Sequence, residues 1–188
     1  MSETIRSFIA VEIENKEVLN KIIRVRDQIY SVAGDNIKPV EDENIHITIR
    51  FLGEIDQYTL NEMKKVLDQI NMNRFFIHVK GLGGFPNLSR PRVLWVGVVE
   101  GSDELIKIRR FIDEKSRGLR IFEDQHQFHP HITIARVKTS IPSKASQILV
   151  SYVDEDFGFS EVTKIVLKKS VLTPRGPIYS DLHVKQLI

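Results

Sequence analysis

Two tetrapeptides of identical sequence contain the residues best suited to do chemistry. His-Ile-Thr-Ile begins at His46 and again at His131. Because the imidazole pKa is ordinarily about 6.5, near neutral pH one ring can accept a proton while another donates one. A threonine hydroxyl nearby can hydrogen-bond oxygens on which charge develops. Two such pairs favour in-line displacement at phosphorus, in which a proton leaves the attacking group on one side and reaches the leaving group on the other.

Both tetrapeptides have the alternation of a half-buried β-strand. Successive side chains of a strand point to opposite faces, so His46 and Thr48 share one face, and His131 and Thr133 share another. The isoleucines then point to the opposite face, toward a core. If two lobes are related by a pseudo-two-fold axis, the two polar faces meet across one cleft.

The same order of elements surrounds both tetrapeptides, which indicates an internal repeat. Apolar patterns predict strands at residues 7–13, 45–52, 75–79, 92–99, 131–137, 163–171 and 180–187, and helices at 16–32, 59–70, 103–117 and 143–152. Asn15 and Ser102 can cap two of these helices, and Thr59 with Glu62 has the spacing of a capping box. Residues 34–44 are typical of a polar loop, and we expect the crossover between the copies at 81–92.

These elements predict an α+β fold that is bilobal, with two pseudo-two-fold-related antiparallel sheets, helices on their outer faces and a central cleft. A parallel doubly wound sheet is disfavoured, because no strand is followed by a glycine-rich phosphate loop and the late strands follow one another without a helix. We expect residues 1–188 to form a single bilobal domain built from copies at about 1–85 and 90–188, with strands that can be exchanged between the lobes.

Composition narrows the classes of function. The chain has no cysteine, which excludes disulfides and thiolate metal sites. No apolar run approaches the roughly 20 residues of a membrane span, and the start of the chain lacks a signal-peptide stretch. We therefore expect a cytoplasmic protein without a membrane partner. We also expect a monomer. The net charge of +2 is too small for a protein that coats long nucleic acid, but it permits a small anionic ligand or the end of an RNA strand.

Four segments carry a resemblance to a known family. They are Arg6-Ser-Phe-Ile-Ala-Val, His46-Ile-Thr-Ile-Arg-Phe-Leu-Gly, Pro91-Arg-Val-Leu-Trp-Val-Gly-Val and His129-Pro-His-Ile-Thr-Ile-Ala-Arg. They resemble the RNA 2′,3′-cyclic phosphodiesterase branch of the 2H phosphoesterase superfamily, also called 2′-5′ RNA ligase. The resemblance implies a bilobal fold, no cofactor, and hydrolysis of RNA 2′,3′-cyclic phosphate ends, or of small cyclic nucleotides, to 2′-phosphates. It also implies His46 as proton donor, His131 as proton acceptor, and Thr48 and Thr133 as substrate-binding residues.

Three further residues near the motifs or in the first strand can be assigned a place. Arg136 lies five residues past His131, so simple alternation turns it away from the histidine face unless a bulge intervenes. The family resemblance implies an arginine at this point near the phosphate, so we include Arg136 among the substrate-binding residues. Arg50 shares the parity of His46 and is interpreted as a surface or rim residue, and Phe8 as a core aromatic.

Other motifs favour structural interpretations. His126, His129 and His131 could suggest a metal site, but no cysteine accompanies them and nothing in the sequence makes His126 converge, so we expect no metal. Gly81-Leu-Gly-Gly84 lacks the spacing of a phosphate loop and indicates a bulge or a crossover. His78 and His183 have no partner in the sequence and are interpreted as structural.

Cyclic phosphate hydrolysis is therefore the leading hypothesis, beside three alternatives. The same histidine pair could serve a 2′-5′ RNA ligase that joins RNA halves, such as those of tRNA. The cleft could belong to a non-catalytic protein that binds RNA ends, although both motifs are intact. The third alternative is a histidine-based metallohydrolase, which would lose its activity on chelation.

Overall fold

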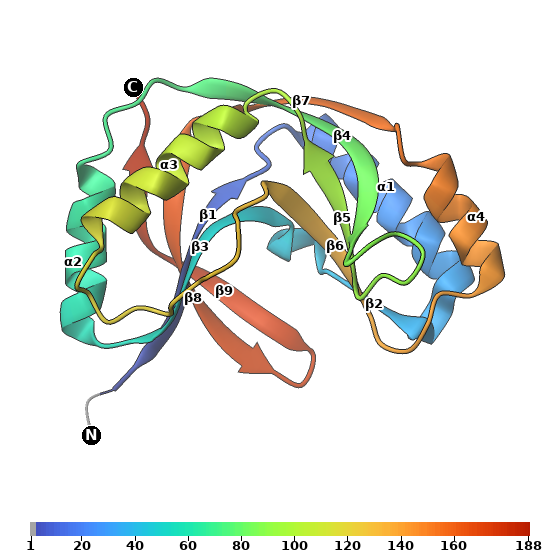
Figure 1. The fold of residues 1–188 in the computed structure, drawn as a ribbon, viewed down its shortest axis with the longest axis horizontal. Helices are drawn as coiled ribbons and strands as arrows, with labels where there is room; N and C mark the ends of the chain where they lie inside the picture. The colour runs from blue at the N-terminus through green and yellow to red at the C-terminus, as the bar shows by residue number, and fades with distance from the viewer. Residues whose placement is uncertain (1–2) are drawn as a thin grey trace.

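The computed structural model describes residues 3–188, which form an α+β fold around a nine-stranded sheet (Figure 1). The strands are β1 (Ile5–Glu12), β2 (Ile37–Pro39), β3 (His46–Ile55), β4 (Phe75–Phe85), β5 (Val93–Val98), β6 (His131–Val137), β7 (Asp156–Val162), β8 (Lys164–Thr173) and β9 (Gly176–Gln186). The α-helices are α1 (Lys16–Ala33), α2 (Gln57–Asp68), α3 (Ser102–Lys115) and α4 (Ser143–Ser151), and two short 3₁₀ helices cover Gly34–Asn36 and Asp42–Asn44.

The sheet has two halves that meet at the motif strands. Its order is β7-β4-β5-β6-β3-β1-β8-β9, with β2 paired to β6, and the strand pairs are antiparallel. The register joins β3 to β6 through one residue pair, Ile47 with Ile132. The α+β prediction is confirmed, and the two half-sheets expected from the sequence form one continuous sheet because these two motif strands pair with each other.

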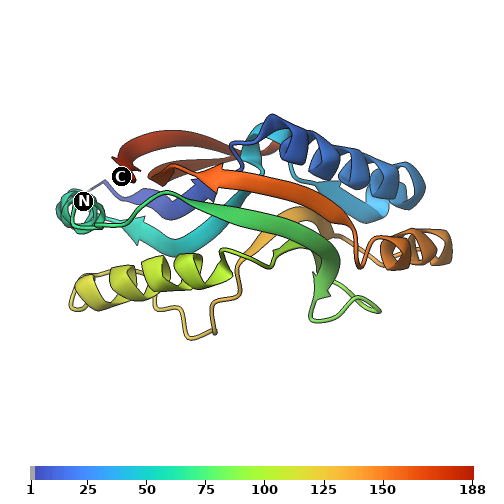
Figure 2. The ribbon, with the colours of Figure 1, turned by 90° about the horizontal axis from the view of Figure 1, so that it is seen from above.

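The helices gather in two pairs at opposite ends of the molecule (Figure 2). Helices α1 and α4 contact each other, and they pack on strands β2, β4, β6 and β7. Helices α2 and α3 contact each other and pack on β9 and β3. Each half of the sheet thus mixes early and late parts of the chain, since β1 and β3 stand beside β8 and β9.

The helix that follows the first strand shows how local sequence sets these elements. The side chain of Asn15 caps α1 by accepting from the backbone N–H of Glu17 at 2.9 Å, as predicted. Its buried residues recur at helical spacing and face the sheet; they are Val18, Ile22, Val25, Arg26, Ile29 and Ala33. None of the helices within residues 3–188 combines the length and the apolar character that a membrane crossing needs.

Some element boundaries differ from the predictions. Helix α2 begins at Gln57 rather than Thr59, because Asp56 is the cap and accepts from the Thr59 backbone N–H at 2.8 Å. Helix α3 is not capped by Ser102, which is its first residue; the cap position is Gly101, in a left-handed conformation with φ of 83°.

The sequence patterns missed two strands and placed the end of strand β4 too early. Strand β2 lies inside the predicted loop 34–44, and its three residues are too few to show an alternation. The second missed strand is β7, at Asp156–Val162. Strand β4 continues through Gly81–Gly84 to Phe85, with a bulge between Val79 and Leu82, so the glycines belong to a bulged strand and the crossover is confined to residues 86–92.

Candidate active site

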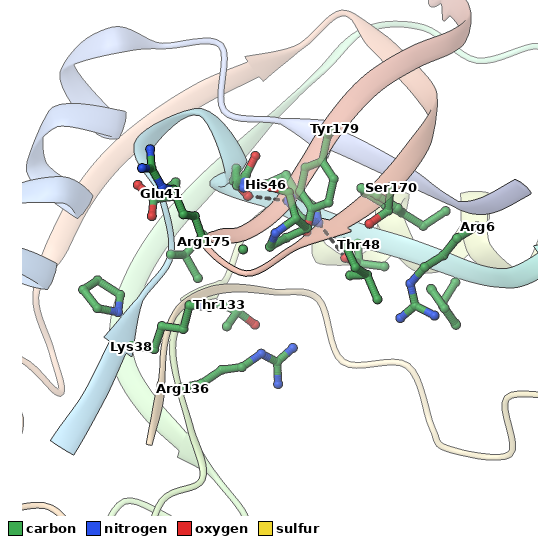
Figure 3. A pocket seen from close by; sticks show the side chains of 18 of the residues that line it. Arg6, Lys38, Glu41, His46, Thr48, Thr133, Arg136, Ser170, Arg175 and Tyr179 are labelled. Carbon is green, nitrogen blue, oxygen red and sulfur yellow. Dashed lines mark hydrogen bonds between the residues drawn. The ribbon is translucent and has the colours of Figure 1, made fainter. Parts of the chain in front are cut away.

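A cavity of about 430 Å³ lies where the two motif strands meet (Figure 3). All five site residues predicted from the sequence line it: His46, Thr48, His131, Thr133 and Arg136. The strands β3 and β6 supply these five side chains, so the two repeated tetrapeptides contribute to one site.

The register of the two strands explains this convergence. Ile47 pairs with Ile132, and both side chains are fully buried. His46 and Thr48 flank Ile47, and His131 and Thr133 flank Ile132, so this one pair brings the four polar residues to the junction of the two strands. All four polar side chains lie on the face opposite to the isoleucines, and that face borders the cavity.

Matching bulges interrupt both strands just after the tetrapeptides' polar residues. In β6 the partners of Leu94 and Trp95 are Ala135 and Thr133, so Ile134 is the extra residue. The alternation resumes one residue later, which returns Arg136 to the cavity face. The strand therefore contains the bulge that is needed to turn Arg136 to the same face as His131.

In β3 the extra residue is Ile49, since Ile9 and Ala10 pair with Arg50 and Thr48. The shift turns Phe51 into the cavity and Arg50 away from it. Arg50 is 6% exposed, so its interpretation as a surface or rim residue is wrong. Its guanidinium donates to Asp113 at 2.9 Å and to the carbonyls of Phe51 and Phe122 at 2.6 and 2.7 Å, contacts that compensate for its burial.

The two imidazole rings are oriented in the same way. Nδ1 of His46 lies 2.6 Å from the carbonyl oxygen of Asn44, and Nδ1 of His131 lies 2.6 Å from that of His129. A carbonyl oxygen only accepts hydrogen bonds, so each Nδ1 carries a hydrogen and donates it. In the neutral ring Nε2 is therefore the basic nitrogen, and Nε2 of His46 lies 2.8 Å from the hydroxyl of Thr48.

Aromatic rings pack against both histidines. The ring of Phe8 lies 5.1 Å from that of His46, and the ring of Tyr179 lies 5.5 Å from it edge-on. The ring of Phe85 lies 4.9 Å from that of His131, again edge-on. Phe8 is 4% exposed, as expected for a core aromatic, and it also forms one wall beside a candidate catalytic ring.

Burial sets the proton affinity of both rings. It lowers the pKa of His46, an effect opposed by the hydrogen bond to the Asn44 carbonyl and reinforced by the nearby Lys168. It also lowers the pKa of His131, against the hydrogen bond to the His129 carbonyl. Without an anion in the cavity, both rings therefore favour the neutral form more than a solvated histidine does.

Several lining residues were not predicted as site residues. Arg6 lies at one side of the cavity, and Lys38, Glu41 and Arg175 lie at the other side (Figure 3). Arg6 shares strand β1 with Phe8 at a spacing of two, which was a usable signal. Arg175 comes from the turn between β8 and β9, far along the chain, and no local pattern connects it to the histidines.

The other four histidines do not line the cavity. His126 has a side chain that is 96% exposed, and it does not join His129 and His131. Within the described residues, 3–188, no three side chains of histidine, cysteine, aspartate or glutamate are grouped to hold a metal ion. His78 and His183 lie outside the cavity lining, where they contact Asp156 at 2.8 Å and Asp68 at 2.7 Å.

Comparisons with known proteins agree with this architecture. The family model of LigT-like phosphoesterases matches the chain twice, at residues 11–95 and 96–179. The RNA 2′,3′-cyclic phosphodiesterase of Aeropyrum pernix is 40% identical over 88% of this chain and 94% of its own. The enzyme of the same name from Archaeoglobus fulgidus is 38% identical over 95% of this chain and 98% of its own. The crystal structure of Escherichia coli LigT complexed with 3′-AMP has the same fold, with a TM-score of 0.78, 24% identity, and coverage of 98% of this chain and 99% of its own.

Proposed function

Because the chain belongs to the family of LigT-like phosphoesterases, we propose that it hydrolyses the 2′,3′-cyclic phosphate at the end of an RNA strand to a 2′-phosphate. Relatives that carry the name RNA 2′,3′-cyclic phosphodiesterase cover nearly the whole chain and support this substrate. The observation that carries the proposal is the pairing of Ile47 with Ile132, which brings both His-x-Thr motifs to one cavity.

The mechanism that we propose uses the two histidines as a base and an acid. Neutral His131 accepts a proton from water at Nε2 as the water oxygen attacks phosphorus. Protonated His46 donates from Nε2 to the ribose 3′ oxygen as the bond between phosphorus and that oxygen breaks. The assignment of donor and acceptor follows the family resemblance, and the fixed Nδ1–H groups of both rings supply the Nε2 geometry that the roles require.

The other polar side chains stabilise charge on phosphorus. Thr48 and Thr133 present hydroxyls from the two strands toward the non-bridging oxygens, where negative charge increases in the transition state. The Arg136 side chain extends into the same cavity and supplies positive charge. The anionic phosphate also raises the pKa of a neighbouring imidazole, which opposes the effect of burial and favours one protonated ring in the complex.

The test is direct. The protein is incubated in chelator with an oligoribonucleotide that ends in a 2′,3′-cyclic phosphate, and the products are separated according to whether they carry a 2′- or a 3′-phosphate. We expect a 2′-phosphate product. A 3′-phosphate would reverse the assigned orientation of the ribose and leave the histidine pair in place, whereas absence of hydrolysis would overturn the proposal.

A further inference from the structure

A row of three side chains leads from the cavity to the protein surface. The guanidinium carbon of Arg6 lies 4.7 Å from the centre of the Phe51 ring, and both residues line the cavity. The Phe51 ring packs edge-on against Phe122, with ring centres 5.5 Å apart and planes at 68°. Phe122 does not line the cavity, and it is 52% exposed.

The outer end of this row is held firmly in place. The backbone N–H of Phe122 donates to the carbonyl of Leu52 at 2.8 Å, and its own carbonyl accepts from Arg50 at 2.7 Å. Gly53 permits this close approach, because a Cβ there would lie 3.1 Å from the Cβ of Phe122, and its φ of +78° disfavours other residues. Since Arg50 is anchored by Asp113, Phe122 is an exposed aromatic ring on a fixed backbone.

The charge of Arg6 is available for an anion. Its partner across the strand pair is Glu54, which accepts a hydrogen bond from the Thr4 hydroxyl at 3.2 Å. Among residues 3–188 no carboxylate lies within ion-pair distance of Arg6. Of the residues found to line the cavity, Glu41 alone is acidic, and it lies on the side away from Arg6 (Figure 3).

The internal repeat shows that this arrangement is special to one end of the cavity. Phe51 and Arg136 occupy equivalent positions, each two residues beyond the bulge of its strand. The first copy therefore has an aromatic ring where the second has a cation, and β1 adds Arg6 above that ring. The two ends of a nearly symmetric cleft consequently differ in the side chains that they present.

We propose that Arg6, Phe51 and Phe122 form a subsite for the nucleotide that precedes the cyclic phosphate end. This inference rests on the proposed function. Arg6 binds the phosphodiester that links the last two nucleotides, and Phe122 stacks on the base of the preceding one. Single strands are bound by such combinations of a cation and aromatic rings, with little dependence on sequence. The preferred substrate is therefore an RNA strand rather than a mononucleotide.

The test compares two substrates that share the same reacting end. One is adenosine 2′,3′-cyclic phosphate, and the other is a tetranucleotide that ends in it. The value of kcat/KM is measured for both with the wild-type protein, Arg6→Gln and Phe122→Ala. The matched control is Arg24→Gln, which removes an exposed arginine of α1 outside the cavity lining.

We expect the wild type to prefer the tetranucleotide, and each subsite variant to lower the ratio of the two kcat/KM values. Loss of one stacked base predicts a decrease of at least about 5-fold for Phe122→Ala. Loss of one phosphate contact predicts that Arg6→Gln reduces the slope of log kcat/KM against log salt concentration by about 0.7 for the tetranucleotide. Arg24→Gln should leave the ratio at the wild-type value.

The outcomes separate this inference from the proposed function. If neither substrate is hydrolysed, the proposed function fails. The subsite is overturned if the wild type has the same kcat/KM for the mononucleotide and the tetranucleotide, or if both subsite variants keep the wild-type ratio. In either case the proposed hydrolase activity stands. Thermal unfolding is recorded for each variant, and Phe122→Leu, which keeps apolar volume but lacks an aromatic face, replaces Phe122→Ala if that variant unfolds.

Discussion

His46 and His131 each stand one residue before the isoleucine of the Ile47–Ile132 pair, the residue pair that joins β3 to β6. Both residues line the same cavity, so their side chains can reach the same group. Both rings also direct Nδ1 to the backbone carbonyl of the residue two positions earlier in the chain. In both rings Nε2 is therefore the nitrogen that remains for the acid–base mechanism proposed above.

Replacing either histidine should remove nearly all hydrolysis. Under the proposed mechanism the leaving oxygen lacks its acid in His46→Ala and the water lacks its base in His131→Ala, so we expect kcat to fall by about 10²- to 10⁴-fold in each. The measurement is steady-state hydrolysis of an RNA cyclic phosphate by variants whose thermal unfolding matches the wild type. His183→Ala, which removes a histidine outside the cavity lining, is the control and should keep full activity. A folded His46 or His131 variant with most of its activity would exclude that ring from catalysis.

The two threonines should each contribute less than a histidine. Thr48→Val and Thr133→Val keep the shape of the side chain and remove the hydroxyl, so we expect losses of roughly 10²-fold in kcat with little change in fold. Thr48→Ser and Thr133→Ser retain the hydroxyl and should recover most of the activity. A serine variant as slow as its valine counterpart would show that the methyl group, and not the hydroxyl, is what the site requires.

The pH dependence should differ between kcat/KM and kcat. The base must be neutral and the acid protonated, so each rate profile is bell-shaped and reports the coupled pair. Burial lowers the pKa of both His46 and His131 in the free protein, so both limbs of the kcat/KM profile should shift to lower pH, with a maximum below about 6.5. A bound phosphate raises both pKa values, which moves the maximum of kcat to higher pH. Coincident maxima, with chemistry rate-limiting, would contradict this electrostatic account.

Activity should survive exhaustive chelation. In the proposed mechanism the acid, the base and the charge-stabilising groups are all protein side chains, and His126 is not grouped with His129 and His131 to hold an ion. Hydrolysis is measured after prolonged dialysis against EDTA, and again after Zn²⁺ or Mn²⁺ is added. A rate that disappears on dialysis and returns with either ion would favour the metallohydrolase alternative.

Asp113 should matter for stability rather than for chemistry. It pairs with Arg50 at 2.9 Å and Arg109 at 2.7 Å, two arginines whose side chains are 7% and 8% exposed. Removing it in Asp113→Ala leaves both cations without this partner, and because Asp113 is 43% exposed we expect a loss of about 1–3 kcal/mol, less than for a fully buried pair. Calorimetric Tm should fall by roughly 2–10 °C, whereas Glu114→Ala, an exposed neighbour on α3, should change it little. A Tm equal to that of the wild type would show that the pairs contribute nothing.

Local patterns in the sequence were sufficient to predict much of the site. The alternation in His-Ile-Thr-Ile places His46 and Thr48, and likewise His131 and Thr133, on one face of a strand, because side-chain direction in a strand depends only on neighbouring residues. The Asn15 cap and the buried stripe of α1 are local for the same reason. The repeat then indicated that two such faces would meet.

Tertiary structure decided what depends on pairing between distant segments. The bulges at Ile49 and Ile134 are defined by mismatched register with β1 and β5, and they alone determine that Arg136 enters the cavity while Arg50 is buried. Tyr179 reaches His46 from a hairpin far along the chain. Periodicity within one strand contains no information about its register with another strand. These features therefore depend on the contacts between the strands, which only the tertiary structure defines.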